Sequence, residues 1–158
     1  MRVCVLCVGG VKGAIASVVS DYETRASRYW RLRVEEVEGG LKKGRKDDPV
    51  SVKDAEAHRL WPRLPEHGEV VALTRSGKAL GSRELAAYLQ EQALRSVPEV
   101  AFVIGGAYGL GSRILDRATA KISLSALTLP HELARLLLAE QLYRAGTISK
   151  NEPYHKGP

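Results

Sequence analysis

The repeated switch in the spacing of apolar residues constrains the fold of this chain more than any other feature. Short segments in which apolar residues run together or alternate, as in strands, are separated by segments in which they recur every three to four residues, as in helices. Strands that alternate with helices are typical of a mostly parallel sheet with helices on both faces. The sequence therefore predicts an α/β fold.

The predicted elements follow one another along all 158 residues. Strands are predicted over 2–8, 31–38, 69–74, 99–104 and 121–125. Helices are predicted from Gly13 to Tyr29, over 51–61, after a cap at Ser82, over 112–119 and over about 131–145. A Ser76-Gly77 turn follows the third strand, and a polar tail follows the last helix. This length suits a single domain, residues 1–158.

Composition excludes several classes of protein. Charged residues make up 27% of the chain without a low-complexity tract, which excludes a disordered protein. No apolar run approaches the ~18 residues of a membrane span, and the apolar stretch near Met1 is too short for a signal peptide. We therefore expect a cytoplasmic globular domain. Its net charge of +6 indicates a polyanionic partner without identifying it.

The two cysteines, Cys4 and Cys7, are predicted to be packed thiols. They have the C-x-x-C spacing of redox and metal sites, but they lie within a predicted buried strand. Positions three apart in a strand face opposite sides and are about 10 Å apart, which is too far for a disulfide. The four histidines are scattered, and no two have metal-ligand spacing. We therefore expect no metal site.

Two loops follow predicted strands at the edge where parallel sheets bind ligands, outside the carboxyl ends of the strands. The first, 105–111, holds four glycines in seven residues, and glycine lets backbone N–H groups approach a ligand closely. It lacks the spacing of a dinucleotide site, and the chain has no P-loop, so a nicotinamide-dependent oxidoreductase is disfavoured. A tight turn and a ligand site both remain open for this loop.

The second loop, from Leu124 to His131, is unusually apolar for a connection. An apolar loop is expected to be buried, and its backbone groups then need hydrogen-bond partners. A ligand with an edge of donors and acceptors, such as adenine, would supply them. The alternative is that this segment is the frayed end of the fifth strand and that Pro130 starts the last helix.

The last helix and the tail have unusual compositions. Seven of the ten positions from 133 to 142 are apolar, so the helix must bury more than one face, against its own core or against another subunit. The tail would normally be assigned to disorder. It nevertheless holds Tyr154 and His155, residue types that stack on bases and move protons.

Four blocks of sequence together carry a family signature. They are Ile104-Gly105-Gly106-x-x-Gly109-Leu110, Ser123-Leu124-Ser125-Ala126-Leu127-Thr128-Leu129-Pro130-His131, Ala139-Glu140-Gln141-Leu142-Tyr143-Arg144-Ala145 and Pro153-Tyr154-His155. They closely resemble the RlmH family, the SPOUT-class methyltransferases that modify pseudouridine in the large ribosomal RNA. The resemblance is dense over the C-terminal third and extends in outline over the rest.

The resemblance implies a SPOUT-like α/β fold in which the C-terminal region, about 100–158, is threaded into a trefoil knot. It also implies a homodimer that binds S-adenosylmethionine in the knot loops, without a metal or a membrane. The cofactor positions carried onto this sequence are Leu73, Gly105, Leu124, Ser125, Ala126, Leu127, Thr128 and Leu129.

The reaction implied by the resemblance is N3 methylation of a pseudouridine in helix 69 of 23S ribosomal RNA, on the assembled ribosome. Because the imide N3 is protonated at neutral pH, transfer requires a base or groups that stabilise the developing anion. We interpret His155 as the base, Arg144 as a group that stabilises the anion or holds a phosphate, and Tyr154 as a group that stacks on or orients the substrate. The alternative is a non-catalytic RNA- or ribosome-binding module with the same fold.

Two features are particular to this chain. Thr74 stands where members of the resembled family commonly have Asp, so any role of that carboxylate is missing here. Residues 25–46 hold eight basic residues against three acids. Within them, the predicted contacts to RNA phosphates are Lys42, Lys43, Arg45 and Lys46, with an affinity that falls as salt rises. The alternative is a solvated charged face.

Overall fold

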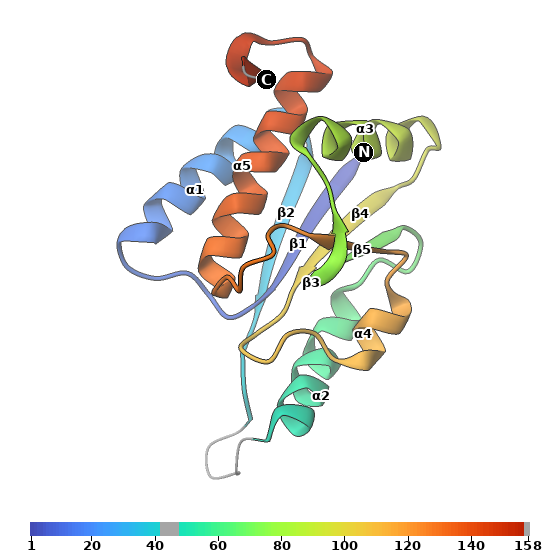
Figure 1. The fold of residues 1–158 in the computed structure, drawn as a ribbon. Coiled ribbons are helices and arrows are strands. Elements are labelled where there is room, and N and C mark those ends of the chain that lie inside the picture. The colour runs from blue at the N-terminus through green and yellow to red at the C-terminus, as the bar shows by residue number, and fades with distance from the viewer. Residues whose placement is uncertain (42–47, 157–158) are drawn as a thin grey trace.

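Five parallel strands form the centre of the computed structural model, which describes residues 1–41 and 48–156. They are β1 (Arg2–Val8), β2 (Arg31–Val37), β3 (Glu69–Ala79), β4 (Glu99–Ile104) and β5 (Ala120–Ser123), in the order β2-β1-β4-β3-β5 (Figure 1). Each strand pairs in parallel with its neighbours. The predicted α/β fold is therefore confirmed.

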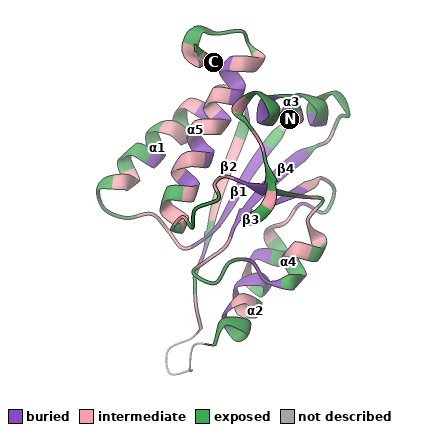
Figure 2. Cartoon of the chain, viewed as in Figure 1, coloured by how far each residue is buried: buried purple, intermediate pink, exposed green. Residues whose placement is uncertain are grey.

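Helices cover both faces of the sheet. α1 (Ala14–Ala26), α3 (Ser82–Leu94) and α5 (His131–Ser149) lie on one face, and α2 (Pro49–Leu60) and α4 (Ser112–Arg117) lie on the other (Figure 1). One apolar cluster lies under each set of helices, so the central strands β1 and β4 are almost entirely buried (Figure 2). Two short 3-10 helices span Trp61–Arg63 and Pro153–His155. None of the described helices is both long and apolar enough to cross a membrane.

Cys4 and Cys7 are packed thiols, as predicted. Both are free and fully buried, and they face opposite sides: Cys4 packs in the cluster under α2 and α4, and Cys7 in the cluster under α1, α3 and α5. Burial raises the pKa of the Cys4 thiol to about 11 and that of Cys7 to about 12. Both thiols are therefore neutral at pH 7, the form that is a poor nucleophile.

The third strand is longer than predicted, and the predicted Ser76-Gly77 turn is wrong. β3 pairs with β5 up to Leu73, loses register, and pairs again from Lys78. The chain bulges here instead of turning, because Gly77 allows it to lie directly against β5. A Cβ at Gly77 would lie 2.6 Å from the backbone of Ile122.

Two helix ends also differ from the prediction. The N-cap of α3 is Gly81, whose N–H donates to the Glu84 carboxylate at 2.7 Å. The predicted cap, Ser82, instead donates its hydroxyl to Gln141 of α5 at 2.7 Å. α5 continues to Ser149, beyond the predicted end near 145, because its last turns remain buried against other elements. Tertiary packing thus overrides the local signals at both ends.

Arg135 joins α5 to two other elements. Its side chain is only 9% exposed, and it pairs with Glu23 of α1 at 2.7 Å and with Glu36 of β2. Burial disfavours the charged guanidinium, but hydrogen bonds to the two carboxylates outweigh it and raise the pKa of Arg135 above its ordinary value. Arg135 therefore stays charged and fixes α5 against α1 and the sheet.

Replacing Arg135 with Met should lower the free energy of unfolding by about 3 kcal/mol, because Glu23 and Glu36 lose their shared cation. Urea denaturation followed by circular dichroism measures the loss. The matched control is Arg25→Met: Arg25 pairs with Asp21 at the surface, with 38% of its side chain exposed. Its removal should cost less than about 1 kcal/mol, and equal losses in the two variants would contradict the role of Arg135.

Candidate functional site

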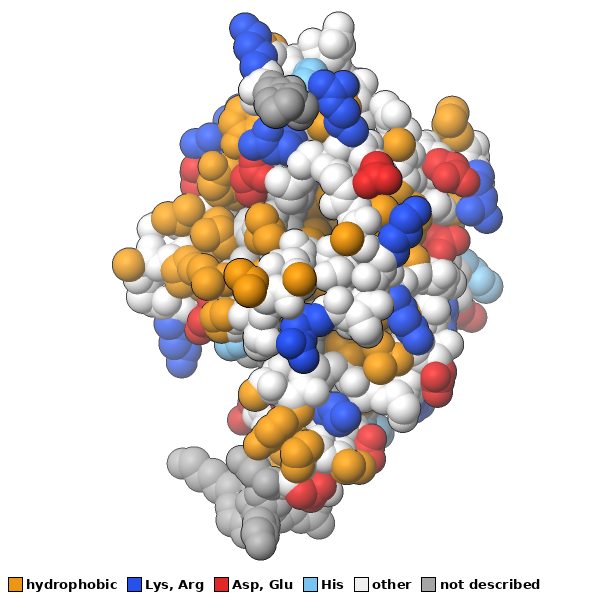
Figure 3. Space-filling model, in the orientation of Figure 1, with side chains coloured by type: hydrophobic (Ala, Val, Ile, Leu, Met, Phe, Trp, Pro, Cys, Tyr) orange, Lys and Arg blue, Asp and Glu red, His pale blue; other side chains and the backbone are white. Residues whose placement is uncertain are grey.

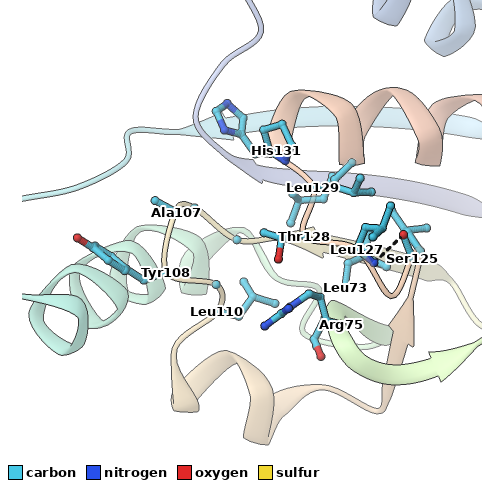
Figure 4. Close-up of a pocket in the computed structure, with 18 residues that line it drawn as sticks. Leu73, Arg75, Ala107, Tyr108, Leu110, Ser125, Leu127, Thr128, Leu129 and His131 are labelled. Atoms are coloured by element: carbon cyan, nitrogen blue, oxygen red, sulfur yellow. Dashed lines mark hydrogen bonds between the residues drawn. The ribbon is translucent and has the colours of Figure 1, made fainter.

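A cavity of about 720 Å³ opens at the carboxyl ends of β4 and β5, beside the middle of β3. Its walls are the glycine loop after β4, the loop between β5 and α5, and the middle of β3 (Figure 4). The lining residues are Leu73, Thr74, Arg75, 104–110, Leu124, Ser125, 127–131 and Ala134. The two loops selected from the sequence therefore lie together, as the rule for parallel sheets predicts. All the predicted cofactor positions except Ala126 line this cavity.

The glycine loop is a tight turn with little room for side chains. The Gly109 N–H donates to the Gly106 carbonyl at 3.0 Å, and Gly109 has a φ of 78°. A Cβ at Gly105 would lie 2.6 Å from the backbone of Gly109. Behind the loop, a Cβ at Gly106 would lie 2.8 Å from the buried carboxylate of Glu56. The loop is thus a tight turn that also forms one wall of the cavity.

The loop between β5 and α5 is more exposed than predicted. Leu127 is 73% exposed and Thr128 is also exposed, so the expectation of a buried loop is wrong for a single chain. Two serines fold this loop: Ser123 Oγ donates to the Ser125 carbonyl at 2.9 Å, and the Leu127 N–H donates to Ser125 Oγ at 3.0 Å. The N–H groups of Thr128 and Leu129 donate to no other described residue. This edge of the cavity therefore offers hydrogen-bond donors to a ligand.

Two polar side chains of the cavity were not assigned a role from the sequence. Arg75 extends from β3 toward the cavity (Figure 4). No sequence signal identifies it, because its direction depends on the bulge in β3. His131 lines the cavity at the start of α5, and its Nε2 lies 3.1 Å from the carbonyl oxygen of Gly10, which ties α5 to the loop after β1.

The predicted catalytic residues Arg144 and Tyr154 share one carboxylate oxygen. Oε1 of Glu140 accepts hydrogen bonds from Nη2 and Nε of Arg144, at 2.6 and 3.0 Å, and from the Tyr154 hydroxyl at 3.1 Å. The Arg144 guanidinium lies 4.9 Å from the centroid of the Tyr154 ring. Sequence reasoning missed Glu140 as the organising residue, although its spacing of four from Arg144 on a helix is a readable signal.

Glu140, Arg144, Tyr154 and His155 form what we call the C-terminal cluster, and the protonation of its groups follows from their contacts. Burial, together with hydrogen bonds to Tyr22 and Glu140, raises the pKa of Tyr154 above its ordinary value. Tyr154 is therefore a protonated phenol at neutral pH, and its ring packs on Tyr143 with centroids 4.5 Å apart. The hydrogen bond to Glu140 raises the pKa of Arg144. Nδ1 of His155 is buried and has no hydrogen-bond partner among the described residues.

The cavity and the C-terminal cluster lie at opposite ends of α5 (Figure 1). Ala134 lines the cavity, and Arg144 follows it by roughly ten residues, which is about 15 Å along a helix. A single chain therefore does not bring the predicted catalytic residues to the cavity.

Two further expectations from the sequence concern the contacts to RNA and the absence of a metal site. The predicted RNA contacts Lys42, Lys43, Arg45 and Lys46 lie outside the described residues. Among the residues that the structure describes, no group of three or more His, Cys, Asp and Glu side chains is arranged to hold a metal ion.

Replacing Gly105 with Ala should collapse the glycine loop, because the new methyl group would clash with the backbone of Gly109. We expect a loss of about tenfold or more in affinity for S-adenosylmethionine, the ligand implied by the resemblance, in isothermal titration calorimetry. Gly81→Ala is the control, since a Cβ there meets its nearest atom, Glu84 Oε2, at 3.5 Å. Unchanged affinity in Gly105→Ala would show that this loop does not contact the ligand.

Two solved structures share this fold. A chain from Neisseria gonorrhoeae, described as a protein of a methylase family, aligns with a TM-score of 0.53 and 14% identity over 90% of this chain and 81% of its own. A "probable methyltransferase" from Bordetella pertussis Tohama I aligns with a TM-score of 0.54 and 18% identity, over 91% of this chain and 95% of its own. At such identities the likeness concerns the fold alone.

Sequence comparison identifies the family. A family model described as "Predicted SPOUT methyltransferase" matches residues 1–155. A relative from Gemmatimonas aurantiaca, named "Ribosomal RNA large subunit methyltransferase H", is 48% identical over 99% of this chain and 100% of its own length. A relative of the same name from Syntrophotalea carbinolica is 40% identical over 98% of this chain and 99% of its own. Because these matches span nearly the whole chain, it belongs to the SPOUT methyltransferases and, within them, to the RlmH family.

Proposed function

We propose that this protein is an S-adenosylmethionine-dependent ribosomal RNA methyltransferase. Its proposed substrate is the N3 atom of a pseudouridine in helix 69 of 23S ribosomal RNA, on the assembled cytoplasmic ribosome. The observation that carries the proposal is the meeting of the glycine loop and the β5–α5 loop around one cavity, in a chain whose relatives are named as large-subunit ribosomal RNA methyltransferases.

The cavity suits S-adenosylmethionine in size and in chemistry. Its volume of about 720 Å³ lies within the range of small-molecule sites, roughly 300–1,000 Å³. The apolar side chains of Leu73, Leu124 and Leu129 offer surfaces for the adenine ring. The free N–H groups of Thr128 and Leu129 offer donors for the acceptors of its edge. When bound there, S-adenosylmethionine would supply an electrophilic methyl group on a sulfonium.

The C-terminal cluster supplies groups suited to activating the substrate. The pseudouridine N3 becomes nucleophilic when it loses its proton, and the half-buried imidazole of His155 is the proposed acceptor. Its Nδ1 is buried and has no hydrogen-bond partner among the described residues, so this atom must be uncovered when the substrate binds. Tyr154 is a poor candidate for this base because its pKa is raised by burial and by hydrogen bonds to Tyr22 and Glu140. Its ring is instead suited to stacking on the substrate base.

Arg144 is suited to an electrostatic role. Glu140 occupies its Nε and Nη2 atoms, which fixes the orientation of the guanidinium. In the described part of the chain Nη1 has no partner, so it is available to stabilise the developing imide anion or to hold a phosphate.

A homodimer would bring the two halves of this site together. Within one chain, the cavity and the C-terminal cluster are separated along α5. In a homodimer, the C-terminal cluster of one chain would lie next to the cavity of the other chain. Hydrophobic side chains gather over α1 and the first half of α5, next to the cavity (Figure 3). Val18, Leu127 and Leu133 are 43%, 73% and 44% exposed. Such a surface is suited to a subunit interface.

The test is methyl transfer from radiolabelled S-adenosylmethionine to ribosomes that lack the modification, followed by mass mapping of the methylated nucleotide. A methyl group at N3 of a pseudouridine in helix 69 is the expected result. Methylation elsewhere would contradict the substrate assignment. Tight ribosome binding without cofactor binding or methylation would contradict the enzyme and favour a binding module of the same fold.

His155→Ala should slow single-turnover methyl transfer by about 100-fold or more, because the proton on N3 loses its acceptor. The affinity for S-adenosylmethionine should change by less than about twofold, since no tail residue lines the cavity of its own chain and the proposed contacts to the cofactor come from the cavity loops. His67→Ala is the matched control because His67 is exposed in the loop before β3 and should leave both quantities unchanged. An unchanged transfer rate in His155→Ala would exclude His155 as the base.

The basic segment is tested by replacing Lys42, Lys43, Arg45 and Lys46 with Gln. If these residues bind phosphates, ribosome binding should weaken, and the slope of log affinity against log salt should fall by about one for each phosphate left without its cation. A variant with Arg2, Arg83, Arg95 and Lys121 replaced by Gln controls for the reduced net charge, since it loses the same four charges from residues that are exposed elsewhere. Equal salt slopes in the two variants would show that the segment is only a solvated face.

A further inference from the structure

Among the described residues, a single permanent charge lies in the wall of the cavity. Among the described residues that line it, Arg75 is the only Lys, Arg, Asp or Glu. The imidazole of His131 is already engaged with the carbonyl oxygen of Gly10. A ligand in this cavity therefore meets its strongest electrostatic interaction at Arg75.

The bulge in β3 aims Arg75 toward the cavity. Pairing with β5 breaks off after Leu73 and resumes at Lys78, so Arg75 lies where the ladder is interrupted. Thr74 Oγ1 accepts a hydrogen bond from the Ser76 N–H at 3.1 Å and lies 2.9 Å from Ser76 Oγ, which holds the shape of the bulge. Figure 4 shows the Arg75 side chain extending from β3 toward Leu110 on the facing wall.

Arg75 has no acidic partner in the described part of the chain. It forms no ion pair there, whereas Arg33, Arg63, Arg135 and Arg144 all pair with glutamates. Its neighbour Thr74 also offers no carboxylate. A guanidinium that is exposed and unpaired, and has a planar fork of donors, is suited to binding a carboxylate with two parallel hydrogen bonds.

We propose that Arg75 binds the α-carboxylate of the amino-acid part of S-adenosylmethionine, an inference that rests on the proposed function. The ligand carries one carboxylate and two positive centres, its ammonium and its sulfonium. Attraction at Arg75 draws the carboxylate toward β3, and repulsion keeps the sulfonium away from the guanidinium. Arg75 thus orients the amino-acid tail, while the β5–α5 loop holds the adenosine.

The test compares S-adenosylmethionine with decarboxylated S-adenosylmethionine by calorimetry, in the wild-type protein and in Arg75→Gln. The decarboxylated ligand keeps the adenosine, the sulfonium and the ammonium, so the pair isolates the carboxylate. Arg75→Gln should weaken S-adenosylmethionine binding by about tenfold, because a charge-assisted pair at a partly exposed site is removed. The decarboxylated ligand should lose no affinity, and its binding should tighten slightly because a repulsive cation is removed.

Two further variants sharpen the comparison. Lys78→Gln removes a charge from the same strand outside the cavity lining and should leave both affinities within about twofold of wild type. Arg75→Lys should recover part of the preference for the carboxylate, because it keeps the charge but loses the fork.

Three other results of these experiments would each contradict the proposed role of Arg75 or the proposed function. An equal loss of affinity for both ligands in Arg75→Gln would mean that Arg75 only supports the wall of the cavity. Unchanged cofactor affinity with weaker ribosome binding would mean that the guanidinium holds an RNA phosphate instead. If wild-type protein binds neither ligand, the proposed function itself fails, and the inference fails with it.

Discussion

The pairing of β3 with both β4 and β5 is the constraint on which the rest of the structure depends. β3 lies between these two strands, so the loops that follow β4 and β5 emerge on either side of it at one edge of the sheet. The cavity exists because those three chain segments end or bulge at the same level. Gly77 makes this arrangement possible, since any side chain there would press into the backbone of Ile122. A site built in this way depends on backbone proximity more than on any catalytic side chain.

The helix α5 imposes a second constraint, of distance. Arg135, buried between Glu23 and Glu36, fixes the helix against α1 and the sheet, so that it acts as a rigid spacer. One end of this spacer contributes to the cavity, and the other end carries Glu140 with Arg144 and Tyr154. Within one chain, a rigid spacer of this length separates the cavity proposed for the cofactor from the residues proposed to activate the substrate. The same rigidity would fix their relative positions when two chains combine.

The sequence predicted the fold well where burial decides the structure. The period of apolar residues located every strand of the sheet, and the fully buried segment from Val3 to Val8 shows why: a strand covered on both faces has a continuous apolar run. Prediction failed where local signals competed with tertiary contacts. Ser76-Gly77 is a turn signal, yet β5 lies beside it and the strand continues. The trefoil knot stays a prediction from resemblance, because threading leaves no trace in periodicity and general rules of connection argue against it.

The candidate site also has a part that the sequence predicted and a part that it did not. Its loops were predictable because their place after β4 and β5 follows from the alternation of strands and helices. The orientation of Arg75 was not predictable, because a one-residue change in register turns a strand side chain to the other face of the sheet. Only the bulge in β3 determines where the Arg75 side chain points. In the proposed enzyme, cofactor binding and methyl transfer would therefore depend on different parts of the assembly. All the described residues that line the cavity come from one chain, so the proposed cofactor affinity would be largely a property of the protomer. Methyl transfer is proposed to need the C-terminal cluster as well, so in the proposed homodimer it would be a property of the pair.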